Sequence, residues 1–523
     1  MKVTKLAVAS LVLAMGASLF ANGSKETKAS GPVTIDLWYG AAVTEAGPPP
    51  ADWEVLSILK EKFNINLQLT ALPSSANDQD QKINAAAAAN ALPDLFMVER
   101  PTWLRLVDQG LLADVDDMYA QMPNRTTHYN ADSKLFTTID GKSYGLASPS
   151  SMVRNEGVLI RKDWLDKLGL KVPTTLDEFM NVMKAFTFND PDGNGKNDTW
   201  GYGAFIEIYS DAEVLGRRME PWMGAFGCAG TWNMTKARPG LKVLQPEYFD
   251  AISWVKKMCD EKVIDPNWLT YKKDDFRAAW KQGRFGIMRE QNAALGAKNN
   301  YAPFDKNFPK GEWMVIDAPK GPKGQQAAGN YSTNFRIYAV SEKAASEGKK
   351  EAIAKMLNWM SDEGPDGGYY LLGWGKEGVN FVRDAAGVPT SKGVPDPAKA
   401  WDKAENVNIT QLRNMVFYNG KVEVQARYPA YETEVSKKIM NPGAILVDMQ
   451  SRPWENAVNN TLLPPPDADV KRFLEQGALE FITGKRELTK ANWDAWVEEF
   501  KKVGGEEWNK KAVDYAKSNN LLH

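Results

Sequence analysis

The sequence predicts an α/β fold that is divided into two or three domains and ends in a helical part. The chain has 523 residues, which is more than one hydrophobic core usually organises. Residues 33–98 alternate strand and helix patterns in the order β-α-β-α-β, and this order requires a parallel sheet covered by helices. Residues 467–518 contain three successive helical patterns.

The elements of the N-terminal region follow from hydrophobic periodicity. Apolar and polar residues alternate in Val33–Tyr39, as in a half-buried strand. Val55, Leu59 and Phe63 recur at helical spacing in the next segment. The predicted elements are a strand at 33–39, a helix at 52–63, a strand at 65–69, a helix at 80–91 and a strand at 92–98.

The chain is predicted to leave its first lobe near residue 150. Strand patterns at 143–147 and 157–160 flank this connection. The stretch Thr175-Leu-Asp-Glu178 is a capping box. In this motif the side chains of Thr175 and Glu178 each accept a hydrogen bond from a free backbone N–H group at the start of a helix. The sequence therefore predicts a well-defined helix after residue 175.

The later elements predict a second lobe, a return to the first lobe and a helical end. Helix patterns occupy 249–260 and 274–282, and the Gly/Pro-rich stretch 321–329 has the composition of a linker. The expected divisions are a signal peptide at 1–21, the N-terminal lobe at 32–150, the C-terminal lobe at 151–328, a return to the N-terminal lobe at 329–395, and the C-terminal lobe with its helical part at 396–523.

Composition excludes several classes of function. The net charge is −2, from 64 basic and 66 acidic residues, which argues against a nucleic-acid-binding surface and a polybasic membrane patch. The sequence has no phosphate-binding loop, dinucleotide fingerprint or CxxC motif, so nucleotide and redox roles have little support. The 18 Trp, 17 Tyr and 20 Phe residues are enough to fill hydrophobic cores and also to line a binding cleft.

The N-terminus has the pattern of a secretory signal peptide. Lys2 and Lys5 supply positive charge, and the apolar stretch Leu6–Ala21 follows. This stretch of 16 residues is short for a membrane span, and no cysteine follows it that could carry a lipoprotein anchor. The alternative is an uncleaved signal anchor. We expect an exported protein.

Cysteine and histidine are scarce. Cys228 and Cys259 are the only cysteines, and a disulfide between them would contribute about 3–4 kcal/mol in the loop-entropy model; two buried free thiols are the alternative. The two histidines are His128 and His523, which excludes a histidine-rich metal site. A Ser-His-Asp triad would have to use His128, and no nucleophile motif lies near it.

An acidic turn after the capped helix matches the oxygen spacing of a calcium loop. Ca²⁺ takes six to eight oxygen ligands, and alternate residues of a curled loop can supply them. Gly195 allows the sharp turn, whereas Gly201 stands where an EF-hand has a bidentate Glu. The candidate ligands are Asp190, Asp192, Asn194, the backbone carbonyl of Lys196, Asp198 and Thr199. The alternative is a solvated turn without metal; we expect a structural Ca²⁺ ion.

Several motifs together resemble one family. The most specific is Trp164–Phe179 followed by the acidic turn Asp190–Gly201; others are Ala91–Phe96, Gly283–Met288 and Gly373–Phe381. They resemble extracellular solute-binding proteins of carbohydrate ABC importers, in the subgroup similar to the lipoprotein LipO and the alginate-oligosaccharide-binding proteins. The motifs span nearly the whole chain in order.

The resemblance implies the two-lobed periplasmic-binding-protein fold of class II, with a mixed, mostly parallel sheet flanked by helices in each lobe and a ligand cleft between the lobes. It implies a monomer that delivers a carbohydrate, expected to be an oligosaccharide, to the permease subunits of an ABC transporter. The alginate-oligosaccharide binders carry Ca²⁺ on the same loop, but they have an acidic residue where this chain has Thr199. Because no lipoprotein cysteine is present, we expect the protein in the periplasm.

Aromatic rings that stack on sugar C–H faces are expected in the cleft. The candidate ligand-binding residues are Trp374, Glu377, Trp103, Trp222, Trp232 and Tyr331. The alternative for each aromatic residue is packing in a core, and Glu377 could instead make a structural hydrogen bond.

Two other classes of protein compete with a binding protein. An exported glycan-degrading enzyme would need two carboxylates that flank the scissile bond at a defined separation, and no signature for such a pair is apparent. A calcium-dependent adhesion module would predict repeats and a β-rich sequence, and neither is visible. We therefore expect no catalytic activity.

Overall fold

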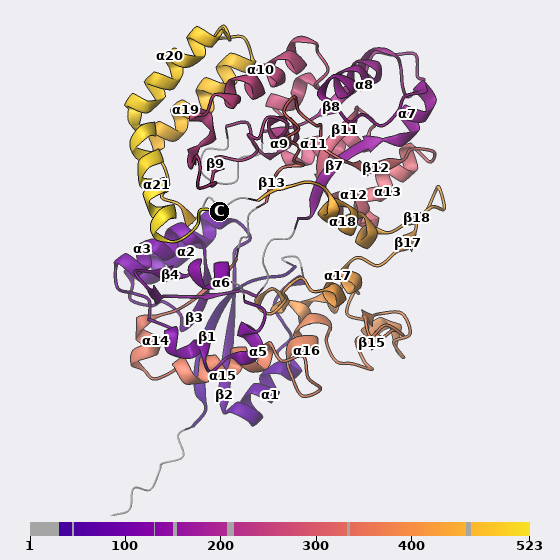
Figure 1. The fold of residues 1–523 in the computed structure, drawn as a ribbon. Coiled ribbons are helices and arrows are strands. Elements are labelled where there is room, and N and C mark those ends of the chain that lie inside the picture. Colours follow the sequence, from indigo (N-terminus) through magenta and orange to yellow (C-terminus); the bar gives the residue numbers. More distant parts are fainter. Residues whose placement is uncertain are drawn as a thin grey trace, which may run out of the picture.

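The computed structural model describes residues 31–43, 46–129, 131–149, 154–206, 214–331, 335–456 and 462–523. These residues form two α/β lobes, each built on its own sheet (Figure 1). The predicted signal peptide at 1–21 lies outside the described residues. Within the described part of the chain, no helix has the length and apolar character needed to cross a membrane.

The sheet of the first lobe confirms the predicted β-α-β-α-β start of the chain. Its five strands have the order β2-β1-β3-β14-β6. Strand β1 pairs in parallel with β2 and β3, whereas β14 runs antiparallel to β3 and β6. The strands are β1 (Val33–Gly40), β2 (Ile65–Leu72), β3 (Leu95–Val98), β6 (Leu146–Ala147) and β14 (Ile337–Val340).

Helices and short hairpins surround this sheet. The helices are α1 (Glu54–Phe63), α2 (Ala76–Ala88), α3 (Arg100–Asp108), α4 (Asp116–Tyr119), α5 (Pro123–Thr126), α6 (Ala131–Leu135), α14 (Glu342–Ser346), α15 (Lys350–Met360), α16 (Tyr369–Trp374) and α17 (Lys421–Arg427). Short paired strands are β4 (Thr138–Ile139) with β5 (Lys142–Ser143), and β15 (Val382–Arg383) with β16 (Pro389–Thr390).

The second lobe has a mixed sheet of four strands in the order β12-β7-β11-β8. Strand β7 is antiparallel to β11 and β12, and β8 is parallel to β11, so this mixed sheet is mostly antiparallel rather than mostly parallel as we expected. The strands are β7 (Glu156–Arg161), β8 (Trp200–Gly203), β11 (Phe285–Gln291) and β12 (Trp313–Ile316). Every residue of β7 is buried, as expected of a strand covered on both faces.

The other α-helices belong to the second lobe. The helices are α7 (Lys162–Leu168), α8 (Leu176–Phe188), α9 (Glu220–Gly224), α10 (Glu247–Asp260), α11 (Lys273–Lys281), α12 (Asn292–Gly296), α13 (Lys298–Asn307), α18 (Pro442–Ser451), α19 (Ala468–Ile482), α20 (Lys490–Phe500) and α21 (Glu506–Ser518). Short paired strands are β9 (Trp232–Asn233) with β10 (Gly240–Leu241), and β17 (Tyr431–Glu432) with β18 (Ile439–Met440). The predicted capping box at Thr175 and Glu178 is confirmed at the start of α8.

Short 3₁₀ and irregular turns join these elements. They are η2 (Arg217–Met219), η3 (Lys242–Leu244), η4 (Pro266–Leu269), η5 (Pro397–Lys399), η6 (Val407–Thr410), η7 (Arg413–Met415) and the π-type turn η9 (Lys501–Gly505). Gly504 interrupts the helical path between α20 and α21 with a φ of 117°, which only glycine adopts readily.

Separate hydrophobic cores belong to the two lobes. The sheet and helices of the first lobe enclose one buried cluster, and those of the second lobe enclose another, with a smaller cluster beside it. We expected 396–523 to belong to the C-terminal lobe, but Leu412, Phe417 and Ala426 pack in the first core. The reason is that this segment covers the apolar side chains around Tyr369 and Trp374. The C-terminal helices do pack in the second core, through residues such as Trp496.

The two lobes meet at two strands between them. Strand β13 (Asn330–Tyr331) pairs in parallel with β19 (Glu455–Asn456), and Figure 1 shows β13 between the two halves of the molecule. We call β13 and β19 the inter-lobe strands. After β13 the chain enters the first core at Phe335. Helix α21 provides a further contact, because Tyr515 lies close enough to Arg100 of α3 to interact with its charge.

Close packing of α8 on β8 gives a first prediction. A Cβ atom at Gly201 would lie 2.5 Å from the Cα atom of Met183, so the helix and strand backbones would have to separate. Gly201→Ala should lower the free energy of unfolding by about 1–3 kcal/mol, measured by urea denaturation. Gly31→Ala is the matched control, because a Cβ atom there meets nothing within 4 Å. Equal stability of the two variants would contradict this packing.

Candidate ligand-binding site between the lobes

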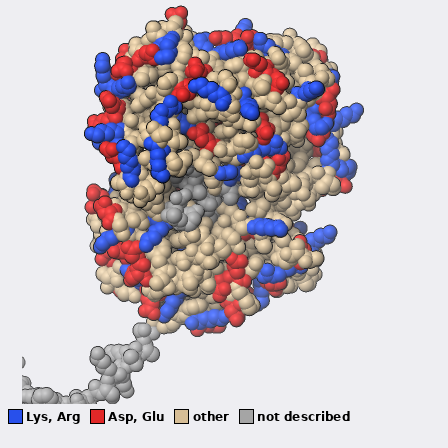
Figure 2. Space-filling view, viewed as in Figure 1, with Lys and Arg blue, Asp and Glu red and all other residues tan. Residues whose placement is uncertain are grey.

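Three polar side chains gather at the inter-lobe strands. The guanidinium of Arg154 lies 4.6 Å from the centre of the Tyr331 ring, and its Nη2 donates a hydrogen bond of 2.6 Å to Oδ1 of Asn456. Arg154 and Tyr331 are half-buried, whereas Asn456 is exposed. An aromatic ring, a cation and an amide are therefore brought together where the two lobes meet. On the face of the molecule drawn in Figure 2, acidic and basic side chains are mixed over both halves.

A buried arginine lies behind these side chains. Arg289 of β11 forms ion pairs with Glu156 at the start of β7 and with Glu220 of α9, the second at 3.3 Å. Its Nε donates a hydrogen bond of 3.0 Å to the carbonyl of Ala328, two residues before β13. One side chain thus ties the sheet of the second lobe to the segment that leads into the first.

The same network holds the backbone of both inter-lobe strands. Glu220 accepts a hydrogen bond of 3.2 Å from the Asn330 backbone N–H. Glu455 of β19 is paired with the buried Lys242 of η3. The Glu455 N–H also donates to the carbonyl of Gly329 at 3.0 Å. The strands are therefore fixed to the second lobe by side chains as well as by their own pairing.

Charge compensation sets the ionisation of these carboxylates. Burial alone would raise the pKa of Glu156, but the charges of Arg289, Arg218 and Arg217 lower it to about 2. Burial raises the pKa of Glu220 and of Glu455 in spite of their cationic neighbours. Glu156 is therefore the carboxylate of this network that is most firmly held in its charged form.

The ionic network continues along β11. Glu290, which is fully buried, lies 3.5 Å from Arg218 and 3.1 Å from Arg277. Arg218 in turn donates a hydrogen bond to the carbonyl of Arg289. Successive residues of one strand thus carry opposite charges, each with partners on neighbouring elements.

The structure places four of the predicted ligand-binding residues elsewhere. Trp103 and Trp222 are 0% exposed, Trp374 is 1% exposed and Trp232 is 2% exposed. Trp374 packs in the first core against Phe417, with ring centres 5.0 Å apart. These rings fill cores and present no face to a cleft in this structure, in contrast to our expectation. The physical reason is that their large apolar area is buried within a single lobe.

The other two predicted residues are separated from each other. Tyr331 lies on β13 at the inter-lobe strands, as described above. Glu377 is exposed on the first lobe and makes an ion pair of 3.1 Å with Arg383. The structure therefore brings only Tyr331 of the predicted set into the candidate site, and it adds Arg154 and Asn456, which the sequence analysis missed.

The acidic turn is curled by its own side chains. Asp190 accepts backbone hydrogen bonds from Gly193, Asn194 and Gly195 at 2.9–3.0 Å. The side-chain amide of Asn194 donates to Asp192 at 2.9 Å and to Asp198 at 3.1 Å. Four of the predicted oxygen-bearing side chains are thus gathered at one turn.

Two features of the turn differ from a complete calcium loop. Thr199 is buried and donates its hydroxyl to the carbonyl of Phe186 at 2.8 Å, so this group serves the end of α8. Position 201 has no room for a side chain, because the backbone of Met183 lies against it. Among the described residues, no set of three or more His, Cys, Asp or Glu side chains has the arrangement of a metal site.

Charge repulsion is visible within the turn. Burial raises the pKa of Asp192, and the neighbouring Asp190 and Asp198 carboxylates raise it further. The hydrogen bonds from Gly195, Asn194 and Gly193 lower the pKa of Asp190 in spite of its desolvation. A cation would relieve this repulsion at Asp190, Asp192, Asn194 and Asp198, whose oxygens suit a hard cation such as Ca²⁺, but the three carboxylates do not have the arrangement of a metal site in this structure. Lys196 is exposed and adds only its backbone carbonyl to this set.

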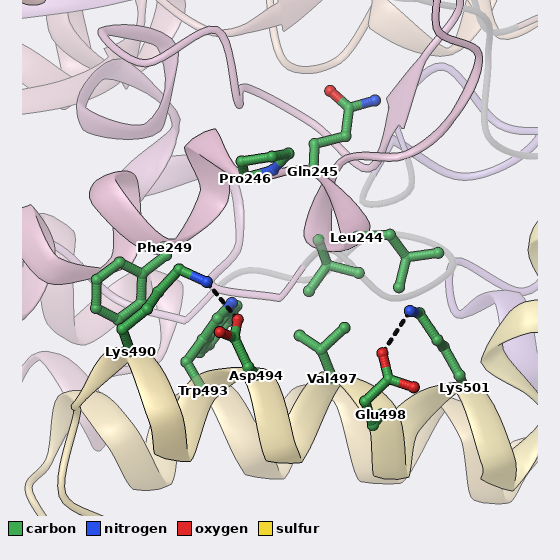
Figure 3. A pocket seen from close by; sticks show the side chains of 11 residues that line it. Leu244, Gln245, Pro246, Phe249, Lys490, Trp493, Asp494, Val497, Glu498 and Lys501 are labelled. Atoms are coloured by element: carbon green, nitrogen blue, oxygen red, sulfur yellow. Dashed lines mark hydrogen bonds and ion pairs between the residues drawn. The ribbon is translucent and has the colours of Figure 1, made fainter.

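A small groove lies elsewhere on the second lobe (Figure 3). Its volume is about 210 Å³, and it separates α20 from the turn that begins α10. Phe249, Trp493 and Val497 line it, and the ion pairs Lys490–Asp494 and Lys501–Glu498 flank it. Ligand pockets usually measure about 300–1,000 Å³, so this groove is too small for an oligosaccharide.

The two cysteines are free thiols in the structure. Burial raises the pKa of both Cys228 and Cys259 to about 12. Thiolates are the reactive form of cysteine, so both side chains are inert at neutral pH. Of the two alternatives, a disulfide or two free thiols, the structure has the free thiols.

Comparison with known proteins identifies the family. The family described as bacterial extracellular solute-binding protein matches residues 51–367, which is more than half of the chain. The chain belongs to this family of extracellular solute-binding proteins, and this membership implies a secreted or periplasmic protein.

Curated relatives extend over nearly the whole chain. The polygalacturonan/rhamnogalacturonan-binding protein YtcQ of Bacillus subtilis is 26% identical over 525 residues, covering 95% of each protein. Lipoprotein LipO of the same organism is 24% identical over 470 residues, covering 86% of each. The fructooligosaccharide ABC transporter substrate-binding protein FusA of Streptococcus pneumoniae is 24% identical over 539 residues, covering 94% of each.

Solved structures share the fold. FusA of S. pneumoniae in complex with kestose has a TM-score of 0.65 at 17% identity and covers 94% of this chain and 100% of that chain. An HMO-binding solute-binding protein from Bifidobacterium longum infantis has a TM-score of 0.68 at 19% identity and covers 93% and 99%. The two-lobed α/β fold predicted from the sequence is therefore confirmed.

The buried network gives a second prediction. The pKa of Glu156 is lowered from 4.5 to about 2, so its contribution to stability is complete above pH 4.5 and is lost as the pH falls towards 2. Glu156→Gln should lower the free energy of unfolding by about 3–5 kcal/mol at neutral pH, because it removes one partner of a buried ion pair. The difference from the wild type should shrink between pH 4.5 and 2.

Urea denaturation over this pH range measures both effects. Glu377→Gln is the matched control, because its ion pair with Arg383 is exposed and should contribute less than about 1 kcal/mol. If Glu156→Gln and Glu377→Gln lowered the free energy of unfolding by equally small amounts, this would contradict a stabilising ion pair between Glu156 and Arg289.

Proposed function

We propose that the protein is the substrate-binding component of an ABC importer and that it captures an oligosaccharide between its two lobes. The observation that carries this proposal is the cluster of Arg154, Tyr331 and Asn456 on and beside the inter-lobe strands of a solute-binding fold. Its relatives YtcQ and FusA are named as binders of polygalacturonan or rhamnogalacturonan and of fructooligosaccharide.

The chemistry of the cluster suits a sugar. A sugar presents C–H faces that pack on an aromatic ring and hydroxyls that need hydrogen-bonding partners. Tyr331 supplies a ring, while Arg154 supplies donors and Asn456 both a donor and an acceptor. A ligand held at this position would contact both lobes, and it would favour the closed arrangement by the difference in its affinity for the two arrangements. A permease could then recognise the closed form.

An exported glycan-degrading enzyme remains the alternative proposal. The buried carboxylates beside the site, Glu156 and Glu220, form ion pairs with Arg289 and so have a structural role. The named relatives are binding proteins rather than enzymes, which supports a non-catalytic receptor. We further propose that the protein acts as a monomer in the periplasm after removal of residues 1–21.

Ligand binding without turnover is the third prediction. A panel of oligosaccharides is tested by thermal shift and calorimetry, and the products are analysed by chromatography. A bound sugar at 100 times its Kd should stabilise the protein by about 2.7 kcal/mol and should be recovered intact. Release of shorter products would favour the enzyme, and the absence of any stabilising sugar would contradict an oligosaccharide receptor.

We also propose that the acidic turn holds a structural Ca²⁺ ion. The ligands would be the side chains of Asp190, Asp192, Asn194 and Asp198 with the carbonyl of Lys196. Solved structures of similar fold include an EF-hand mutant of FusA and the alginate-binding protein AlgQ2 without calcium ion, so a calcium loop occurs on this fold. The buried hydroxyl of Thr199 is already bonded to Phe186, so water would complete the coordination.

Calcium dependence is the fourth prediction. Ca²⁺ should raise the melting temperature of the wild type, and the chelator EGTA should reverse the increase. Asp190→Asn should abolish the increase, because it removes one of the anionic ligands. Asp177→Asn, on the exposed first turn of α8, should retain it. A wild-type melting temperature that does not respond to Ca²⁺ would contradict a metal site.

A further inference from the structure

We propose that the ligand is an acidic oligosaccharide built from uronic acids, and that Arg154 binds a carboxylate of the sugar. This inference rests on the proposed function, because it assumes that an oligosaccharide binds between the lobes. It adds the charge of the ligand and the residue that selects for it.

The orientation of Arg154 is fixed by two contacts on different segments. Tyr331 packs against the guanidinium at 4.6 Å from its ring centre, and Asn456 accepts one hydrogen bond at 2.6 Å. A guanidinium has five N–H donors, and one of them serves Asn456. A planar group held in this way is prepared for a bidentate contact with a carboxylate, whose two oxygens match its spacing.

The carboxylates of the site have other partners. Glu156 and Glu220 are paired with Arg289, while Glu455 is paired with Lys242. Glu290 is paired with Arg218 and Arg277. Among the residues that the structure describes, no Asp or Glu oxygen lies within ion-pair distance of the Arg154 guanidinium.

Among the residues that the structure describes, the balance of charge around the inter-lobe strands is positive. Arg289, Arg218, Arg277 and Lys242 offset the four carboxylates Glu156, Glu220, Glu290 and Glu455 in number. Arg154 remains beyond this balance and is half-buried. Burial also raises the pKa of Glu220 and Glu455, which reduces the negative charge further in weak acid. The site therefore favours an anionic ligand over a neutral one.

A structural role is the alternative for Arg154. Its contacts with Tyr331 and Asn456 join two segments that are 302 residues apart in sequence, so the side chain could serve only to hold them together. A structural role would affect all ligands alike, whereas a role in selection would affect only acidic ones. The two roles are therefore separable by comparing matched sugars.

Calorimetry with matched ligands tests the inference. The probes are trimeric oligogalacturonate and oligomannuronate, each compared with its carboxyl-reduced counterpart, which has the same linkages and no charge. The wild type should bind one of the acidic trimers at least tenfold more tightly than its reduced form. This factor corresponds to about 1.4 kcal/mol, in the range of a hydrogen bond to a charged group.

Substitution of Arg154 should remove the preference. Arg154→Gln should weaken binding of the acidic trimer about 10- to 100-fold and should change binding of the reduced trimer less than threefold. Arg154→Lys should retain part of the preference, because it keeps the charge but not the planar fork. Lys501→Gln, beside the groove at α20, is the control and should bind as the wild type does.

The possible results distinguish the two proposals. Equal or tighter binding of the reduced sugar by the wild type would overturn the acidic ligand and leave an oligosaccharide receptor standing. An equal loss of both sugars in Arg154→Gln would overturn selection by Arg154 and would indicate a structural role. Failure of every acidic and neutral sugar to bind the wild type would overturn both proposals.

Discussion

The architecture between the lobes depends on the burial of Arg289 among carboxylates. A charge removed from water is costly unless it is paired and hydrogen-bonded, and Arg289 meets this requirement through Glu156, Glu220 and the carbonyl of Ala328. These partners belong to the sheet, to α9 and to the segment before β13. The ion pairs and the hydrogen bond that stabilise the buried charge of Arg289 therefore also fix the position of the strands that join the lobes.

The same network holds the strands that carry the proposed ligand site. The segment around β13 is bonded to this network through Ala328 and Asn330, and the chain then enters the first core at Phe335. Arg154, Tyr331 and Asn456 are held at this boundary, so a molecule bound there can contact both lobes. At the proposed site, binding energy would be coupled to the relative position of the lobes, which is what a solute-binding protein requires to signal that it is loaded.

Sequence periodicity predicted the helices and strands, but it could not predict the proposed ligand site. The strands and helices of 33–98 and the capping box at Thr175 follow from local patterns, and the structure confirms them. The site could not be predicted in this way, because Arg154 meets its partner Asn456 from 302 residues away. Tryptophan was a misleading signal, since Trp103 and Trp374 fill the core of the first lobe. Arg154 has no local motif, and only the pairing of β13 with β19 reveals its surroundings.

The most direct measurement is a crystal structure of the protein with a bound uronic-acid oligosaccharide. The account predicts that the sugar lies between the lobes, with a carboxylate about 2.7–2.9 Å from the guanidinium nitrogens of Arg154 and a sugar face against Tyr331. A sugar found in the groove beside α20, or one bound between the lobes with its carboxylates turned away from Arg154, would contradict it.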